Sequence, residues 1–199
     1  LIEAFDLLKK ERSQGNINPV RTGVSLPVDG SITFPSVSSF RVTDGSQRRS
    51  NGVKLLFVGD GRLRKECEDL ARLKGLEKDI IFAGLQKDMD GIYQVADVFI
   101  LSSLWEGCPN VLLEAMVNKL PSVSTGVSGA SEIINHLENG YLVKSRDSSA
   151  LFQAMKFMLE NPQKREEFGK KGFERAARDF SLEKNIKKLE FLFNEVVKK

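Results

Sequence analysis

Residues 97–114 read DVFILSSLWEGCPNVLLE, and this stretch decides the fold of the chain. Its opening run, Asp97–Leu101, is typical of a buried strand, and a helix is predicted to follow over residues 109–118. Where a strand of an open α/β sheet leads through a turn into a helix, the backbone N–H groups at the start of that helix attract anions. The stretch therefore predicts an α/β fold with a ligand site directly after this strand.

Two carboxylates, Glu106 and Glu114, flank the turn between this strand and its helix. The helix dipole explains an acidic residue at position 106, near the helix N-terminus. It does not explain Glu114, which follows about two helical turns later among apolar neighbours. We expect this carboxylate to be embedded beside apolar side chains and to need a partner, either the vicinal hydroxyls of a sugar or a nearby lysine. The backbone N–H groups of the turn can bind a phosphate, and the two carboxylates can bind hydroxyl groups. Together they favour a ligand that contains both a sugar and a phosphate.

The rest of the chain alternates strands and helices at the spacing that is typical of parallel βαβ units. We predict an α/β fold with a Rossmann-like parallel sheet, helices on both of its faces and a helical C-terminus. The strands are expected at residues 54–58, 79–84, 97–101, 121–124 and 141–143. The helices are expected at residues 1–13, 63–73 with Gly75 as cap, around 92–95, 109–118 and 131–135, followed by three more, of which the second starts at Pro162 and the third is capped by Ser181.

Composition narrows the class of protein. With 199 residues and 41% hydrophobic content the chain can bury a core, and we predict a single domain over residues 1–199. A net charge of +3 is too small to predict nucleic-acid binding. Cys67 and Cys108 stand apart and His136 is the single histidine, which favours neither a zinc cluster nor a disulfide framework and indicates a reducing, cytoplasmic setting. No apolar run approaches the roughly 18 residues of a membrane span.

Two segments differ from this regular pattern. Residues 14–52 are rich in Ser, Gly, Asn and Pro, which favours a low-complexity insertion or mobile loop over the weak hairpin that Ile32/Phe34 and Phe40/Val42 would form. The first residue is Leu1, and it falls inside an amphipathic helical pattern. We therefore expect the chain to be a piece of a longer protein.

A second glycine-rich turn follows the strand at residues 54–58. The run Gly59-Asp60-Gly61-Arg62-Leu63-Arg64 is similar to GxGxxG, but Arg64 takes the place of the third glycine, where close packing of helix and strand needs no side chain. This excludes a nicotinamide or flavin site. Gly59 and Gly61 serve either the geometry of the turn or the presentation of amides to a diphosphate.

Three further features have an ordinary structural interpretation. His136 is expected to be a surface histidine at a helix end, since the chain has no Gly-x-Ser-x-Gly elbow. Trp105 is expected to fill the core, with the wall of a ligand pocket as the alternative. The last helix carries Leu182, Ile186, Leu189, Phe193 and Val197 in one stripe. We expect this helix to pack on the protein with a solvated basic face, and membrane contact is the alternative.

The order of the motifs over residues 53–180 resembles the C-terminal domain of the family 4 retaining glycosyltransferases, also called group 1, and residues 1–10 resemble the first helix of that domain. The residues that carry the resemblance are Val58-Gly59-Asp60-Gly61, Phe82-Ala83-Gly84, Ala96 to Ser103, Glu106-Gly107-Cys108-Pro109-Asn110-Val111-Leu112-Leu113-Glu114-Ala115-Met116, Leu120-Pro121, Ser131-Glu132-Ile133 and Asn139 to Val143. The resemblance implies a two-domain GT-B enzyme. Its C-terminal domain holds a nucleotide-diphosphate sugar, and its N-terminal domain binds the acceptor.

The resemblance also implies roles for individual residues. Glu106 is similar to the family's catalytic glutamate, which contacts the donor hexose near the reaction centre, and Glu114 to the one that binds the ribose hydroxyls. Leu85 would contact the base through its backbone. The turn Gly107 to Val111 would contact sugar and diphosphate, with Cys108, Asn110 and its end residues supplying N–H groups and Pro109, which has no N–H, shaping the turn. Gly59 and Gly61, where they present amides, would lie near the diphosphate. Transfer would proceed with retention and without a metal or other cofactor, through an internal-return route in which the leaving diphosphate deprotonates the acceptor.

Departures from the family pattern limit what we expect of this chain. The Gly-Arg and Lys that neutralise the diphosphate in the family, and the acceptor domain, would precede Leu1, so we expect poor or no turnover. Lys119 stands where the family commonly has a helix-ending glycine, and we expect the local turn to differ there.

Alternative functions are a non-catalytic nucleotide-sugar-binding protein and, less favoured, a sugar-nucleotide 2-epimerase, which lacks the spacing between Glu106 and Glu114. The expected acceptor is a surface polysaccharide or lipid-linked glycan. The expected location is the cytoplasm, with peripheral contact at the inner face of the membrane as a variant.

Overall fold

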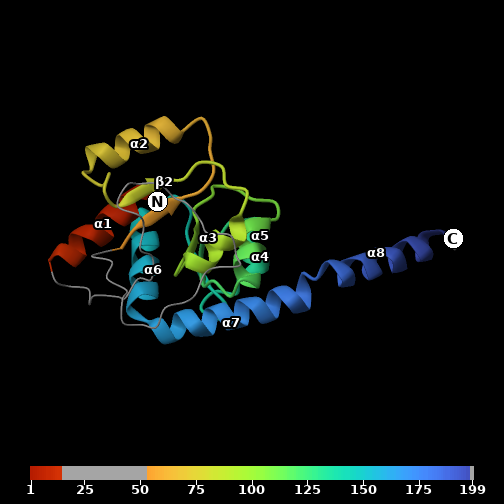
Figure 1. Cartoon of the computed structure of the whole chain (residues 1–199). Helices are drawn as coiled ribbons and strands as arrows, with labels where there is room; N and C mark the ends of the chain where they lie inside the picture. The colour runs from red at the N-terminus through yellow and green to blue at the C-terminus, as the bar shows by residue number, and fades with distance from the viewer. Residues whose placement is uncertain (15–52, 198–199) are drawn as a thin grey trace. The chain divides into compact units, whose positions relative to one another are not determined.

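The computed structural model describes residues 1–14 and 53–197 (Figure 1). The predicted insertion or hairpin over residues 14–52 therefore lies, beyond its first residue, outside the described residues. The chain divides into two compact units, Leu1–Val98 with Arg146–Pro162 and Phe99–Ser145 with Gln163–Lys199. The single domain over residues 1–199 stays a prediction.

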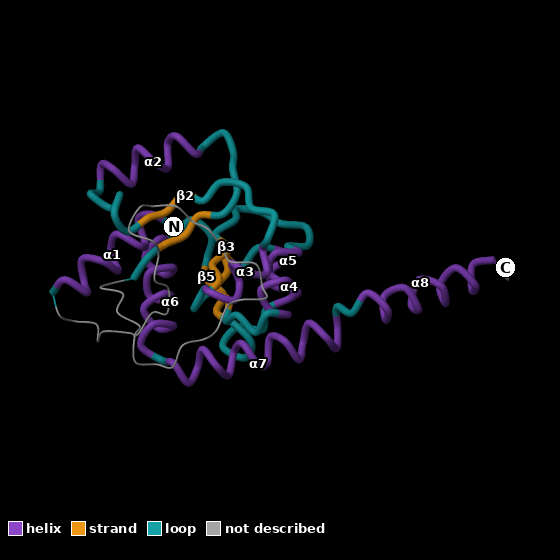
Figure 2. Tube along the Cα trace, viewed as in Figure 1, coloured by secondary structure: helices purple, strands orange, loops and turns teal. Residues whose placement is uncertain are grey.

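The first unit pairs two short parallel strands and surrounds them with helices. Strand β1 runs parallel to β2, with Leu55 opposite Ile80, and the rings of Phe57 and Phe82 stack with their centroids 5.1 Å apart. Helix α1 lies beside α6 (Figure 2), and both bury apolar side chains, among them Phe5 and Met158. The elements are α1 (Ile2–Ser13), β1 (Leu55–Phe57), α2 (Arg64–Leu73), β2 (Ile80–Phe82), α3 (Met89–Val95) and α6 (Ser148–Glu160).

Ion pairs tie α1 to the rest of its unit. Asp79, just before β2, contacts Lys9 and Lys54 at 2.8 Å each. Asp6 is buried and accepts hydrogen bonds from Lys10 at 2.9 Å and from Lys74 at 3.2 Å. Burial alone would raise the pKa of both carboxyls, but the lysine hydrogen bonds outweigh it and hold each pKa below its ordinary value. Both aspartates are therefore charged anchors of this unit.

The second unit contains a parallel sheet of three strands in the order β3-β4-β5. Strand β4 is buried along its whole length because it lies between the other two. The elements are β3 (Phe99–Leu101), α4 (Asn110–Val117), β4 (Ser122–Thr125), α5 (Ser128–Ile133), β5 (Tyr141–Val143), α7 (Pro162–Asp179) and α8 (Leu182–Val197).

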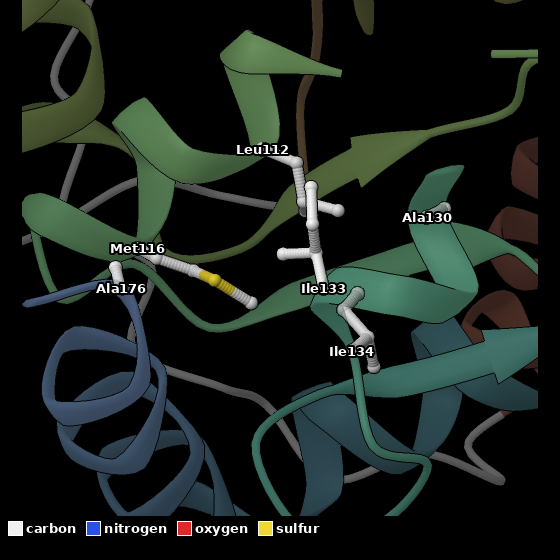
Figure 3. Packing of buried hydrophobic residues seen from close by; sticks show 6 residues of the cluster. All are labelled: Leu112, Met116, Ala130, Ile133, Ile134 and Ala176. Carbon is white, nitrogen blue, oxygen red and sulfur yellow. The ribbon is translucent and has the colours of Figure 1, made fainter. Parts of the chain in front are cut away.

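The core of the second unit joins α4, α5 and α7. Leu112 and Met116 point from α4 toward Ile133 at the end of α5, and Ala176 comes from α7 (Figure 3). A side chain at Gly169 of α7 would overlap the backbone carbonyl that follows α4, so this glycine permits close approach of the two helices. The helix that carries Glu114 and follows the turn of Glu106 is thus fixed by a packed core.

Helix α4 ends in a Schellman motif whose left-handed residue is Lys119. Its φ angle is 56°, its N–H donates to the Met116 carbonyl, and the Leu120 N–H donates to the Ala115 carbonyl, both at 2.9 Å. The expectation that the turn would differ because glycine is missing is wrong: the lysine adopts the glycine conformation. Helix α2 ends in the same motif, with Gly75 at a φ angle of 67° as predicted.

The predicted fold class is confirmed, since parallel strands alternate with flanking helices and the C-terminus is helical. Two details differ from the predicted elements. Helix α5 begins at Ser128, ahead of the predicted Ser131. Helix α2 begins at Arg64, after the predicted Leu63; both Leu63 and Leu73 are exposed, and the buried residue of that helix is Ala71.

The last helix gives a further difference. We expected α8 to pack on the protein, but none of its residues from Leu182 to Val197 is buried. Its large apolar side chains, including Leu189 and Phe193, are exposed in the described part of the chain.

Candidate functional site

The turn after β3 carries the first candidate carboxylate, Glu106. This residue is half-buried, and its Oε1 atom accepts a hydrogen bond from the Ser103 hydroxyl at 2.7 Å. Its backbone carbonyl accepts a hydrogen bond from the Gly129 N–H at 3.2 Å. Both the side chain and the main chain of Glu106 are therefore held by neighbours in the same unit.

The turn continues into the N-terminus of α4. Pro109 is buried and precedes the helix as its N-cap residue, and its side chain makes no capping hydrogen bond. Gly107, Cys108 and Asn110 are exposed, and Val111 begins the exposed face of the helix. An exposed helix start is electrostatically suited to an anion such as a diphosphate.

Glu114 lies on the exposed face of α4, together with Val111 and Val117. The expectation that it would be embedded among apolar residues is wrong. Leu112 and Ala115, its near neighbours in sequence, are fully buried, because a rotation of about 100° per residue turns them toward the core and Glu114 away from it. The carboxylate is accessible to a ligand from solvent.

Trp105 is 83% exposed, so the expectation that it would fill the core is wrong as well. It sits beside exposed Leu104 in the loop that precedes Glu106, and no element among the described residues buries it. The apolar run in the sequence continued past the end of β3, although the strand itself ends at Leu101.

The remaining candidate residues belong to the first unit. The Gly59 N–H donates to the Gly84 carbonyl at 2.7 Å, and both glycines have positive φ angles, 115° and 67°. Leu85 follows directly and is 80% exposed. The Gly61 N–H donates to the carboxylate of Asp60 at 2.7 Å. The ends of β1 and β2 are thus joined, and the Leu85 segment is presented to solvent.

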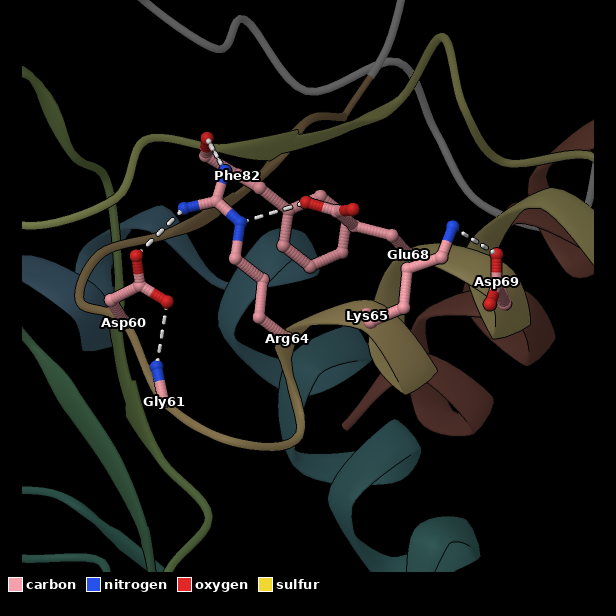
Figure 4. Close-up of polar contacts among 7 residues, drawn as sticks. All are labelled: Asp60, Gly61, Arg64, Lys65, Glu68, Asp69 and Phe82. Atoms are coloured by element: carbon pink, nitrogen blue, oxygen red, sulfur yellow. Dashed lines mark hydrogen bonds and ion pairs between the residues drawn. The ribbon is translucent and has the colours of Figure 1, made fainter.

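Arg64 holds this arrangement together (Figure 4). Its guanidinium donates to Glu68 at 2.8 Å, to Asp60 at 3.2 Å and to the Phe82 carbonyl at 3.3 Å. The hydrogen bond to Glu68, opposed by some desolvation, raises the pKa of Arg64 above its ordinary value. In the sequence Arg64 served only to exclude a dinucleotide site. The structure assigns it a role of its own, since it links the turn after β1, helix α2 and the end of β2.

The structure thus brings the predicted site residues together in two groups, one in each unit. The first group is Gly59, Gly61 and Leu85, and the second is Glu106, Gly107, Cys108, Pro109, Asn110, Val111 and Glu114. Ser103 belongs with the second group and was not singled out from the sequence, because its bond to Glu106 depends on the conformation of the loop.

His136 is exposed, as predicted, and its Nδ1 atom accepts a hydrogen bond from the Leu142 N–H at 3.1 Å. Cys67 and Cys108 are both unpaired thiols.

The described residues include no group of three or more histidine, cysteine, aspartate or glutamate side chains arranged to hold a metal ion. Among these same residues, no helix combines the length and the hydropathy needed to cross a bilayer.

Comparison with known proteins connects this geometry to a family. The chain is 30% identical over 142 residues to the putative glycosyltransferase EpsD of Bacillus subtilis (strain 168), which covers 71% of the chain and 37% of EpsD. It is also 30% identical over 101 residues to UDP-Gal:alpha-D-GlcNAc-diphosphoundecaprenol alpha-1,3-galactosyltransferase of Escherichia coli, over 50% of the chain and 26% of that enzyme. The chain therefore spans less than half the length of these curated relatives.

Solved structures show the same fold. A TarM variant of S. aureus in complex with Fondaparinux, alpha-GlcNAc-glycerol and UDP matches with a TM-score of 0.69 and 26% identity, over 72% of this chain and 29% of that one. The structural neighbours are GT-B glycosyltransferases. The sequence matches the family described as "Glycosyl transferases group 1" over residues 41–175, which include the whole turn from Glu106 to Glu114. This chain belongs to the group 1 glycosyltransferases.

Proposed function

We propose that the chain is the donor-binding part of a retaining glycosyltransferase that moves a glycosyl group from a nucleotide-diphosphate sugar to an acceptor hydroxyl. The observation that carries the proposal is the Glu106 carboxylate, held by Ser103 in the turn that leads into α4, inside the segment that matches the family. A fixed carboxylate just before a helix offers acceptors for sugar hydroxyls, and the helix N-terminus offers a positive end for a diphosphate.

In this proposal Glu106 contacts the donor hexose and acts at the reaction centre. Glu114 binds the ribose hydroxyls, which its exposed position on α4 supports. The turn residues Gly107, Cys108, Pro109, Asn110 and Val111 contact the sugar and the diphosphate. In the first unit Leu85 contacts the base through its backbone, and Gly59 and Gly61 lie near the diphosphate. The exposure of Leu85 supports a backbone contact with a ligand.

The proposed chemistry needs little from side chains beyond position and charge. The bond between the anomeric carbon and the diphosphate breaks, the leaving oxygen takes the proton of the acceptor hydroxyl, and the new glycosidic bond forms on the same face. The protein's task in this route, which needs no metal or cofactor, is to stabilise the charge that develops on the leaving diphosphate. The amides at the start of α4 are suited to this task.

The names of two relatives support a class of acceptor. The E. coli relative acts, by its name, with UDP-Gal on a diphosphoundecaprenol-linked sugar. Another relative, from Salmonella typhi, is described as a Vi polysaccharide biosynthesis protein and is 35% identical over 105 residues. We therefore propose a lipid-linked glycan or surface polysaccharide as the acceptor, bound through a separate N-terminal domain. The proposed location is cytoplasmic, with peripheral contact at the inner face of the membrane.

Calorimetric titration tests the donor-binding function. UDP-glucose, GDP-mannose and ADP-glucose are titrated into the 199-residue chain. We expect one of them to bind, and we expect Glu114→Ala to weaken that binding about tenfold, since a hydrogen bond to a charged group contributes roughly 1.5–3 kcal/mol.

The matched control for this titration is Glu174→Ala, which removes an exposed helical glutamate of the same unit. It should bind the nucleotide sugar as the wild type does. Failure of all three nucleotide sugars to bind the wild type contradicts the proposal. Equal binding by wild type and Glu114→Ala contradicts the role of Glu114 in holding the ribose.

A further inference from the structure

The conformation of Glu106 depends on a chain of two short hydrogen bonds. The Ser103 hydroxyl donates to the Glu106 Oε1 atom at 2.7 Å. In the described part of the chain, this hydroxyl is the one hydrogen-bond partner of the Glu106 carboxylate. A hydroxyl has a single proton to donate, so the proton of Ser103 is committed to Glu106. The Glu106 carboxylate accepts hydrogen bonds and donates none, so a sugar hydroxyl that contacts it acts as the donor.

Ser103 is itself held by a residue of the neighbouring strand. Thr125, the last residue of β4, is 4% exposed, and its hydroxyl donates to the Ser103 carbonyl at 2.6 Å. The end of β4 is fixed in turn, because the Gly126 N–H donates to the Val143 carbonyl at 2.7 Å. A buried strand end thus anchors the first half of the loop that carries Glu106.

The main chain of Glu106 is held by a separate hydrogen bond from α5. Its carbonyl accepts the Gly129 N–H at the start of α5. The carboxylate and the backbone of Glu106 are therefore restrained by separate elements, β4 through Ser103 and α5 through Gly129. Removal of the Ser103 hydroxyl frees the carboxylate and leaves the backbone contact with α5 in place.

We propose that Ser103, anchored by Thr125, is a positioning residue that holds the Glu106 carboxylate for contact with the hexose of the donor. This inference rests on the proposed function of the chain and adds the two side chains on which the sugar contact depends. Because Ser103 acts through Glu106, its loss affects the sugar moiety and leaves contacts with the nucleoside diphosphate unchanged.

Paired titrations separate the sugar from the nucleotide. The nucleotide sugar that the wild type binds, chosen from UDP-glucose, GDP-mannose and ADP-glucose, is compared with the matching free nucleoside diphosphate. For Ser103→Ala we expect the affinity for the nucleotide sugar to fall about five- to tenfold, as for a hydrogen bond to a charged group. The affinity for the nucleoside diphosphate should stay within about twofold, since Ser103 has no contact with the turn amides in this scheme.

Three further variants distinguish positioning from a general effect on the loop. Ser103→Thr keeps the hydroxyl and should restore the affinity for the nucleotide sugar. Thr125→Val keeps the shape of the side chain but removes its hydroxyl, and should weaken the nucleotide sugar selectively by about threefold. Ser102→Ala, at the exposed neighbouring position, should bind both ligands as the wild type does. Thermal unfolding of each variant confirms that it is folded.

The outcomes are distinct. Wild-type affinity of Ser103→Ala for the nucleotide sugar overturns the inference, and so does an equal loss of affinity for both ligands. Failure of Ser103→Thr to restore binding also overturns it. Failure of the wild type to bind any of the three nucleotide sugars overturns the proposed function, and the inference with it.

Discussion

Gly129 lies so close to Gly107 that a Cβ atom at position 129 would overlap the Gly107 carbonyl. The same Cβ atom would come within 3.0 Å of the Pro109 ring. The N-terminus of α5 and the turn after Glu106 are therefore in backbone contact, and this contact requires glycine at position 129.

Gly129→Ala should displace the turn or lower stability by about 1–3 kcal/mol, the usual cost of overpacking. Urea unfolding measures the change. Gly126→Ala, three residues earlier in the loop before α5, is the matched control, because a Cβ atom there would meet its nearest neighbour, the Val143 carbonyl, at an ordinary 3.6 Å. If both variants unfold at the same urea concentration as the wild type, the close approach of α5 to the turn is not real.

The left-handed conformation of Lys119 should make it a site of stored strain. A non-glycine residue in this conformation costs about 1–2 kcal/mol. The Lys119 ammonium lies 5.2 Å from the centre of the Phe173 ring. An exposed cation–π contact of this kind stabilises the folded state by roughly 0.5–1 kcal/mol. Lys119→Ala loses the contact and keeps the strain, whereas Lys119→Gly loses both.

We therefore expect Lys119→Gly to be more stable than Lys119→Ala by about 1 kcal/mol, measured by urea unfolding. Gly75 provides the converse experiment, since it occupies the same position of the Schellman motif in α2. Gly75→Ala should be less stable than the wild type. A Lys119→Gly variant that is less stable than Lys119→Ala would show that the strain is absent.

The first unit should lose stability in acid through Asp6 and Asp79. Their pKa values are lower in the folded chain than their ordinary values near 4. The folded state therefore binds fewer protons than the unfolded state. The stabilisation is fully present above about pH 4 and is lost as the pH falls through the lowered folded-state pKa values.

Urea midpoints at pH 7 and pH 3 test this pH dependence. The difference between the two midpoints should be smaller in Asp79→Asn than in the wild type, because one of the two titrating carboxylates is gone. Asp69→Asn serves as the control, since Asp69 pairs with Lys65 and Arg72 on the exposed surface of α2. An unchanged difference in Asp79→Asn would contradict the assignment.

Arg64→Lys should destabilise the first unit, although it preserves the charge. A lysine cannot reach three acceptors in the fork geometry with which Arg64 contacts Glu68, Asp60 and the Phe82 carbonyl. Thermal unfolding should show a lower Tm for Arg64→Lys than for Arg72→Lys, whose side chain is more exposed and contacts only Asp69 among the described residues. Equal Tm values for the two variants would mean that the Arg64 contacts are not stabilising.

Periodicity in the sequence predicted most of the elements, because short apolar runs such as Leu55–Phe57 and Tyr141–Val143 are separated by clear turn residues. The turn of the candidate site was also predicted, since a strand, a Gly-x-Pro turn and a helix follow one another within residues 97–118.

The exposures of Glu114 and Trp105 were not predicted, for two different reasons. Glu114 is adjacent to apolar residues along the chain but faces the opposite side of the helix, so adjacency in sequence did not mean contact. Trp105 follows an apolar strand, but it lies in a loop whose path depends on backbone contacts such as the one between Glu106 and Gly129. Such contacts join residues far apart in sequence and leave no periodic signal.

Helix α8 has a consequence for the kinetics of amide hydrogen exchange. With no buried residue between Leu182 and Val197, its 16 residues gain no protection from a packed core in the described chain. A helix of that length is marginal in water by itself, so its amides should exchange with deuterium almost as fast as those of an unfolded peptide. The amides of α4, buried through Leu112 and Met116, should exchange orders of magnitude more slowly. Deuterium uptake would therefore distinguish α8 from α4, whereas circular dichroism records both as helix.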